Sequence, residues 1–251
     1  MNGTGLLFDQ SEVQDAIETG ELIAWKKKRY IAFRETMQST RYPCYFAANA
    51  EDNDTARYLF AGNIRDRDAL LKVRDGLREY LERYQSIAER TTLVIFFKPP
   101  NKDQSEQEYR DQFWRVLEFL HKRDPEPWPS DIPTDPDDPE WEFCFSGEPM
   151  FIVGRAPFYT DRKSRYTPYG LEITVQPRGI LDDISGNTIE GQHARSIIRD
   201  RLKDYDDIAP HPDIGDYSDP TTREWKQYIL PTSNDESLNE FPFEISAWFE
   251  E

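Results

Sequence analysis

The chain has 251 residues, of which 37% are hydrophobic and 14% aromatic, and its 48 acidic against 31 basic residues give a net charge of −17. This charge disfavours contact with nucleic-acid backbones or anionic membranes, because both reward the opposite sign. No apolar run approaches the roughly 18 residues of a membrane helix, and the first residues lack the basic start and apolar core of a signal peptide. We therefore expect a soluble, cytoplasmic protein with no nucleic-acid or membrane partner.

The surface composition favours one explanation of the acidity. Aspartate is abundant, and lysine accounts for only ten of the 31 basic residues. A hydrated carboxylate surface that is poor in lysine suits a high-salt cytoplasm, where screening removes the self-repulsion. This predicts a halophile origin, with an ordinary acidic mesophile protein as the alternative. The two cysteines, Cys44 and Cys144, form neither a CxxC pair nor a disulfide framework, which fits a reducing compartment.

The first half of the chain alternates helical and strand-like patterns. Hydrophobic periodicity predicts helices at 11–19, 24–37, 68–88 and 106–122. Compact β-rich runs predict strands at 57–61 and 93–97, and the residues 44–47 that follow Pro43 are expected to begin a strand or turn.

The second half begins with an acidic, proline-rich segment at 124–139, which has too little apolar surface to pack as a core. It could divide two domains, but strands on both sides favour an excursion within a single domain of residues 1–251. Strands are predicted at 150–153 and 171–175, helices at 188–205 and 222–229, and an aromatic tail from residue 234 onward is expected to dock. Strands interleaved with helices indicate an α+β (or α/β) fold, a single mixed β-sheet flanked by helices.

A cluster of cations follows the apolar strand at 150–153. Within 24 residues of this acidic chain stand Arg155, Arg162, Lys163, Arg165 and Arg178, separated by turn residues and aromatics. Cations on a loop directly after a buried strand are well placed to hold an anionic group. The alternative is that they neutralise neighbouring surface carboxylates.

Few residues have the spacing of a known catalytic or metal site. His121, His193 and His211 form no HExxH motif and have no cysteine partners, which argues against a classical zinc site. His121 fits a helix C-terminus, His211 is expected to face solvent, and His193 could reach a site. Cys44, beside Pro43 and three aromatics, is either a shielded soft ligand or a small buried hydrophobe. The chain lacks GxGxxG and P-loop motifs, so a nucleotide phosphate site is unsupported.

Several short motifs occur in a recognisable order over residues 30 to 231. They are Tyr42-Pro43-Cys44, the run from Gly147 to Gly154 ending in FIVG, Pro157 with Ser164-Arg165, the run 198–201, and the run 224–228. In this order and spacing the chain resembles the YqcI/YcgG family. Characterised members of that family look like haem-dependent N-oxygenases that hydroxylate an amine or guanidine nitrogen of arginine- or lysine-like substrates. The resemblance implies haem as cofactor, a small-molecule substrate and an electron donor.

The resemblance also implies roles for individual residues. Cys44 would be the axial thiolate ligand of the haem, with His193 as the alternative ligand. Arg155, Arg162 and Arg165 would hold a substrate carboxylate or the haem propionates, and Glu148 would face a guanidinium or ammonium. The predicted catalytic pair is Glu148 and Arg155, and the predicted substrate-binding set is Arg162, Arg165, Arg178, Arg199 and Tyr228.

The chain departs from the family pattern at two positions. Members commonly have a histidine soon after the FIVG-like strand and another in an Asn-Pro-His motif after the next strand, where this chain has Ala156 and Gln176-Pro177. An alternative therefore stays open, a non-catalytic small-molecule-binding or stress-related module of the same scaffold that has lost haem.

Overall fold

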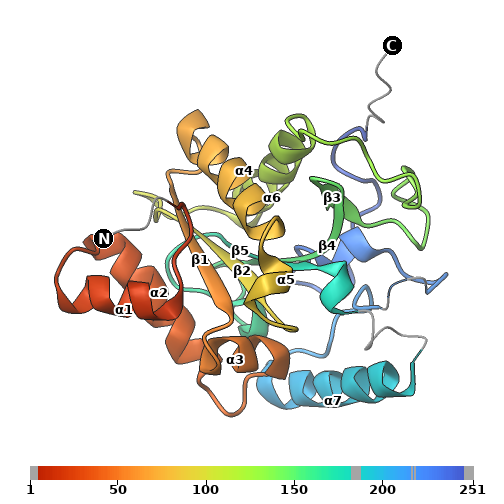
Figure 1. The fold of residues 1–251 in the computed structure, drawn as a ribbon. Helices are drawn as coiled ribbons and strands as arrows, with labels where there is room; N and C mark the ends of the chain where they lie inside the picture. The colour runs from red at the N-terminus through yellow and green to blue at the C-terminus, as the bar shows by residue number, and fades with distance from the viewer. Residues whose placement is uncertain (1–4, 182–187, 216, 218, 246–251) are drawn as a thin grey trace.

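A mixed five-stranded sheet in the order β1-β2-β5-β4-β3 forms the centre of the computed structural model (Figure 1). The β1 and β2 strands are parallel, and every other neighbouring pair is antiparallel. The structure describes residues 5–181, 188–215, 217 and 219–245. The elements are α1 (Gln10–Glu18), α2 (Ala24–Met37), α3 (Tyr45–Asp52), β1 (Ala56–Gly62), α4 (Arg67–Leu81), α5 (Tyr84–Ile87), β2 (Thr92–Phe97), α6 (Glu106–His121), β3 (Phe143–Phe145), β4 (Glu148–Arg155), η1 (Lys163–Arg165), β5 (Glu172–Pro177), η2 (Arg178–Ile180), α7 (Ile189–Tyr205) and η4 (Glu224–Gln227).

Both faces of the sheet are covered by helices. All residues of β2 are buried, as its continuous apolar sequence TLVIFF requires of a strand packed on two sides. The α4 and α6 helices pack on one face, whereas α1, α2 and α3 pack on the other face over β1 and β2. The α7 helix lies near α3, on the side of the molecule away from α4 and α6 (Figure 1).

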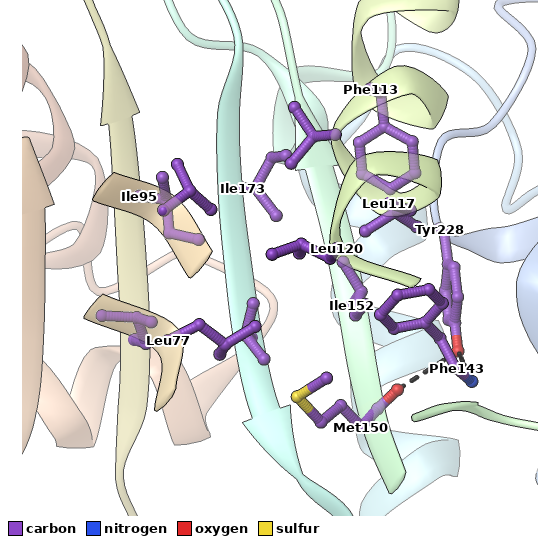
Figure 2. Close-up of a cluster of buried hydrophobic side chains, with 14 of the residues drawn as sticks. Leu77, Ile95, Phe113, Leu117, Leu120, Phe143, Met150, Ile152, Ile173 and Tyr228 are labelled. Atoms are coloured by element: carbon purple, nitrogen blue, oxygen red, sulfur yellow. Dashed lines mark hydrogen bonds between the residues drawn. The ribbon is translucent and has the colours of Figure 1, made fainter. Parts of the chain in front are cut away.

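The larger core lies between the sheet and the two helices α4 and α6 (Figure 2). Phe113 and Leu117 of α6 meet Ile152 of β4 there, and all three side chains are almost fully buried. Gly154 allows this close packing, because a Cβ at that position would lie 3.0 Å from the Phe113 ring and 3.3 Å from the carbonyl oxygen of Tyr228. The fold thus fixes one face of β4 in the core and leaves its other face for a different use.

The sequence predicted the fold class and most elements, and four details differ. The strand or turn predicted at residues 44–47 is wrong, because α3 begins at Tyr45 with Cys44 as its N-cap. The single helix predicted at 68–88 is two helices, since the backbone leaves the helical region at Arg83. The helix predicted at 222–229 is only the short η4, because Gly154 N donates to the carbonyl of Tyr228 at 2.7 Å and ties that segment to β4. The strand β3 was not predicted.

The acidic segment at 124–139 is docked against the rest of the protein. Asp124 Oδ1 accepts a hydrogen bond from Ser146 N at 2.9 Å, and Trp225 Nε1 donates to the carbonyl of Pro136 at 3.0 Å. The ring of Trp128 stacks on that of Trp141, with centroids 6.1 Å apart. Among the described helices, none has the length and apolar composition of a membrane span.

Candidate functional site

A cavity of about 280 Å³ lies on the face of β4 and β5 that the larger core leaves free. Alternate residues of a strand share a face, so Phe151 and Val153 of β4 and Thr174 and Gln176 of β5 line it together. Further apolar side chains of the wall come from α2 and α7, among them Phe33, Met37, Ile198 and Leu202.

The α7 helix forms the outer wall. Thr188 caps its N-terminus by accepting a hydrogen bond from Gly191 N at 2.9 Å. Positions 195, 198, 202 and 206 recur at helical spacing and all line the cavity. The other face of the helix is exposed, and the predicted residues His193 and Arg199 lie there, outside the cavity. The helix therefore contributes Arg195 and Asp206 to the site, which the sequence analysis did not select.

One end of the cavity is built around a buried ion pair. Arg155 Nη1 donates to Glu172 Oε1 at 2.5 Å and Nη2 to the carbonyl of Tyr166 at 2.7 Å. Glu172 also lies 3.8 Å from Arg29 Nη2, so this carboxylate joins α2 to the sheet. Burial acts to lower the pKa of Arg155, but Glu172, aided by Tyr42, raises it above its ordinary value. The charge of Arg155 is thus paired within the protein, although its side chain lines the cavity and its Nε has no hydrogen-bond partner among the described residues.

Arg162 is differently placed. It is 2% exposed and its Nη2 donates to Asn234 Oδ1 at 2.8 Å. Its Nε and Nη1 atoms have no hydrogen-bond partner among the residues that the structure describes. Burial lowers its pKa from the ordinary arginine value. A buried cation with two unused donors is costly unless an anion completes it.

Neighbouring groups at this end are satisfied by the protein. Arg165 donates to the carbonyls of Gln227 and Tyr228 at 3.0 and 3.2 Å. Asp206 at the end of α7 accepts from the backbone N and the hydroxyl of Ser164 at 2.7 and 2.8 Å. Burial raises the pKa of Asp206, and the two bonds from Ser164 act in the opposite direction. The contacts of Ser164 thus anchor η1 to the end of α7, and those of Arg165 anchor it to η4.

The other end of the cavity carries two buried glutamates. Glu142, which precedes β3, lies 2.6 Å from Arg178 Nη1. Glu224 of η4 accepts a hydrogen bond from Gln227 Nε2 at 3.0 Å. Burial, reinforced by the charge of Glu142, raises the pKa of Glu224 to about 8, while Arg178, Gln227 and Arg195 act to lower it. Sequence reasoning missed both carboxylates as site residues, although Glu224 opens the quoted run 224–228 and Glu142 directly precedes an apolar run.

The two cysteines have different environments. Cys44 is half-buried and lines the cavity. Cys144 is buried, its Sγ lies 3.4 Å from the carbonyl oxygen of Glu142, and burial raises the pKa of its thiol well above the ordinary value. Cys44 is accordingly the accessible thiol of the described structure.

Two further predicted residues lie away from the cavity. Glu148 is half-buried at the start of β4, where Tyr84 Oη donates to its Oε2 at 3.4 Å. Tyr228 is fully buried in the larger core, where its Oη accepts from Phe143 N and donates to the carbonyl of Met150, both at 3.2 Å (Figure 2). His211, expected to face solvent, is instead buried, with Nε2 3.0 Å from the carbonyl oxygen of Glu236.

The donor chemistry of the cavity is compatible with the haem that the sequence resemblance implies. A thiol (Cys44), apolar walls and a buried arginine with unused donors (Arg162) meet in one space. The cavity volume of about 280 Å³ is just below the roughly 300–1,000 Å³ of typical small-molecule sites. No group of three His, Cys, Asp or Glu residues within the described ranges is arranged to hold a bare metal ion.

Comparisons with known proteins give a consistent result. The family model of the YqcI/YcgG family matches residues 33–244. Two proteins of Bacillus subtilis (strain 168) are similar. "Uncharacterized protein YcgG" is 35% identical over 89% of each chain, and "Uncharacterized protein YqcI" is 32% identical over 94% of each chain. A protein of Streptomyces lavendulae named "Putative N(omega)-hydroxy-L-arginine synthase DcsA" is 28% identical over 94% of this chain and 89% of its own. No solved structure matches.

Proposed function

Because the chain belongs to the YqcI/YcgG family, we propose that it hydroxylates an amine or guanidine nitrogen of a small, amino-acid-derived substrate in the cavity between β4, β5 and α7. The observation that carries the proposal is the meeting of an accessible thiol, buried cations and buried carboxylates in one apolar cavity. The name of the Streptomyces relative supports the same class of reaction.

The reaction balances with O2 and an external electron donor. An N–H bond and an O–O bond break, one oxygen atom forms the new N–OH group, and the other leaves as water after uptake of two electrons and two protons. A haem held through the Cys44 thiolate would supply the activation of O2, since a thiolate ligand favours O–O cleavage.

The protein's own residues bind and orient the substrate. Arg162 offers Nε and Nη1 to an anionic group, either a substrate carboxylate or a haem propionate. The apolar side chains of Phe151, Val153 and Leu202 exclude water from the cavity. Arg155 and Glu172 hold the floor of the cavity in place rather than contacting the substrate with a free charge.

The test begins with the absorption spectrum of protein expressed with added haem. We expect a Soret band at one haem per chain, and loss or a shift of that band in Cys44→Ala. Incubation with L-arginine or L-lysine, a reductant and 18O2 should yield a product 18 mass units heavier than the substrate. Absence of a Soret band at stoichiometric loading, together with absence of labelled product, would contradict the proposal.

A second function is favoured by a specific observation. None of the three histidines lines the cavity, and the family's histidine positions carry Ala156, which is buried beside Tyr166, and Gln176, an amide on the cavity floor. On this basis the chain would be a non-catalytic module that binds an amino-acid-sized ligand. Thermal stabilisation by such ligands without haem binding or turnover distinguishes this function from the first.

A further inference from the structure

The charged groups of the cavity are separated along the sheet. Arg155 pairs with Glu172 in the register of β4 and β5, and Phe151 pairs with Gln176. These two pairs are four strand residues apart, which is about 13 Å at 3.3 Å per residue. Arg162 belongs to the Arg155 end through Ser164 and Asp206, which close the same end of the cavity.

Glu142 and Arg178 belong to the opposite end. Phe143, the neighbour of Glu142, pairs with Met150, and so does Pro177, the neighbour of Arg178. Their side chains form the 2.6 Å ion pair. The α7 helix runs between the ends, since Arg195 and Asp206 both line the cavity and are eleven residues apart, about 16 Å along a helix.

At one end of the cavity, Arg162 has hydrogen-bond donors that suit an anion. Its Nε and Nη1 atoms make no hydrogen bond to any described residue, and the side chain is 2% exposed. Asp206, whose negative charge acts on Arg162, is already held by Ser164. A carboxylate supplied by a ligand would accept a hydrogen bond from one of these donors and offset the buried charge.

At the other end, the carboxylates of Glu142 and Glu224 suit a cation. Glu142 is offset by Arg178, whereas Glu224 Oε2 accepts a hydrogen bond from the neutral amide of Gln227. Within the described part of the chain, no hydrogen bond reaches Glu224 Oε1. The groups that face Glu224 are Glu142, Arg178 of η2, Arg195 of α7 and Gln227 of its own element, with Tyr228 behind it. A ligand nitrogen carrying positive charge would complete this carboxylate.

We propose that the cavity binds an amino acid with a cationic side chain in a single orientation, with its α-carboxylate at Arg162 and its side-chain nitrogen at Glu224 beside Glu142. The proposal rests on the proposed function and adds the residues that select the substrate. It places the nitrogen to be hydroxylated at the Glu224 end.

This arrangement couples binding to proton release. Burial and Glu142 raise the pKa of Glu224 to about 8, so this carboxyl is mostly protonated at pH 7. A bound cation favours the charged carboxylate, and the proton is therefore released when the ligand binds. Affinity should rise with pH up to about 8 and then level off.

The experiment is isothermal titration calorimetry on the full chain as purified, with L-arginine and its neutral near-isostere L-citrulline. In buffers of different ionisation enthalpy, wild type should release close to one proton per arginine at pH 7 and almost none at pH 9.5. Citrulline should bind about 10- to 100-fold more weakly, the range of one lost charge-assisted hydrogen bond. This measurement needs no variant and so does not depend on how variants fold.

Variants assign the two ends. Glu224→Gln should weaken arginine binding about 10- to 100-fold and abolish proton release, while leaving citrulline binding unchanged. Arg162→Met should weaken both ligands alike. The matched control is Glu79→Gln, because Glu79 is a half-buried glutamate of α4 that accepts a hydrogen bond from Leu6 N and lies outside the cavity. Equal affinity for arginine and citrulline, or arginine binding that is unchanged in Glu224→Gln, would overturn the inference.

The inference and the proposed function fail separately. Binding of arginine that depends on Glu224 without formation of N-hydroxylated product would retain the inference and reject the function. Formation of that product by Glu224→Gln with unchanged KM would reject the inference and retain the function.

Discussion

Replacing Glu172 by glutamine should destabilise the protein strongly, because it leaves two buried arginines without their common counter-charge. The side chains of Arg29, Arg155 and Glu172 are 0%, 2% and 0% exposed, and Glu172 lies 3.8 Å from Arg29 and 2.5 Å from Arg155. Arg29 also donates to the carbonyls of Gly170 and Leu171, and Arg155 to that of Tyr166, so neither guanidinium can turn toward water without breaking other bonds.

The magnitude follows from these contacts. The glutamine amide keeps the shape of the side chain but loses the charge, and removing one partner of a buried pair costs about 3–5 kcal/mol. For a chain of this size, that loss lowers the melting temperature by roughly 6–20 °C. Urea unfolding followed by far-UV circular dichroism measures the free energy of unfolding directly. The slope against urea should stay unchanged, because the same surface is exposed.

Two companion variants sharpen the result. Glu148→Gln, on the same sheet, keeps its contact with Tyr84 and should cost less than about 1 kcal/mol. The double variant Glu172→Gln with Arg155→Met should be more stable than Glu172→Gln alone, since one of the two uncompensated charges is removed. A cost below about 1 kcal/mol for Glu172→Gln, or a double variant less stable than that single variant, would refute the reasoning.

Four other expectations concern the site and the surface. Tyr228→Phe removes the two 3.2 Å hydrogen bonds to Phe143 and Met150, and it should lower the free energy of unfolding in urea titrations by about 1–3 kcal/mol. Ligand affinity in calorimetry should stay unchanged, and a selective loss of binding would show instead that Tyr228 contacts the ligand. Mass spectrometry after maleimide treatment of the native protein should find Cys44 modified and Cys144 intact, because only Cys44 is accessible; equal labelling would contradict the structure. Glu224 has a folded-state pKa of about 8, above its ordinary value, so the folded state binds the extra proton and stability should fall as pH rises from about 4.5 to 8. In urea titrations, the free energy of unfolding of Glu224→Gln should therefore vary less with pH than that of wild type, and identical profiles would be inconsistent with this. If the halophile prediction holds, molar KCl should raise the free energy of unfolding through screening of the net charge of −17; full stability in dilute buffer with no gain from salt would argue against it.

The sequence contained enough information for the fold class because periodicity is a local property. The compact β-rich run at 93–97 predicted a strand, and the spacing of Phe113, Leu117 and Leu120 predicted one face of a helix. Local patterns failed where long-range contacts decided the backbone. The hydrogen bond from Gly154 N to the Tyr228 carbonyl ended the helix predicted at 222–229, and no pattern of 3.6 or 2 residues could signal it.

The sequence by itself determined that cations gather after β4 and that Cys44 stands in a motif of the family. Only the tertiary structure decided which of these charges remain available. Arg155 forms an ion pair with Glu172, seventeen residues further along the chain, and Arg165 donates hydrogen bonds to the carbonyls of Gln227 and Tyr228. Two donors of Arg162, by contrast, have no partner among the described residues. Likewise Glu148 was placed beside Tyr84, and Glu142 and Glu224, 82 residues apart, were brought to one end of the cavity. The physical reason is that a carboxylate or guanidinium looks the same in any sequence, and its charge becomes chemically useful only through burial and through the partners that the fold supplies or withholds.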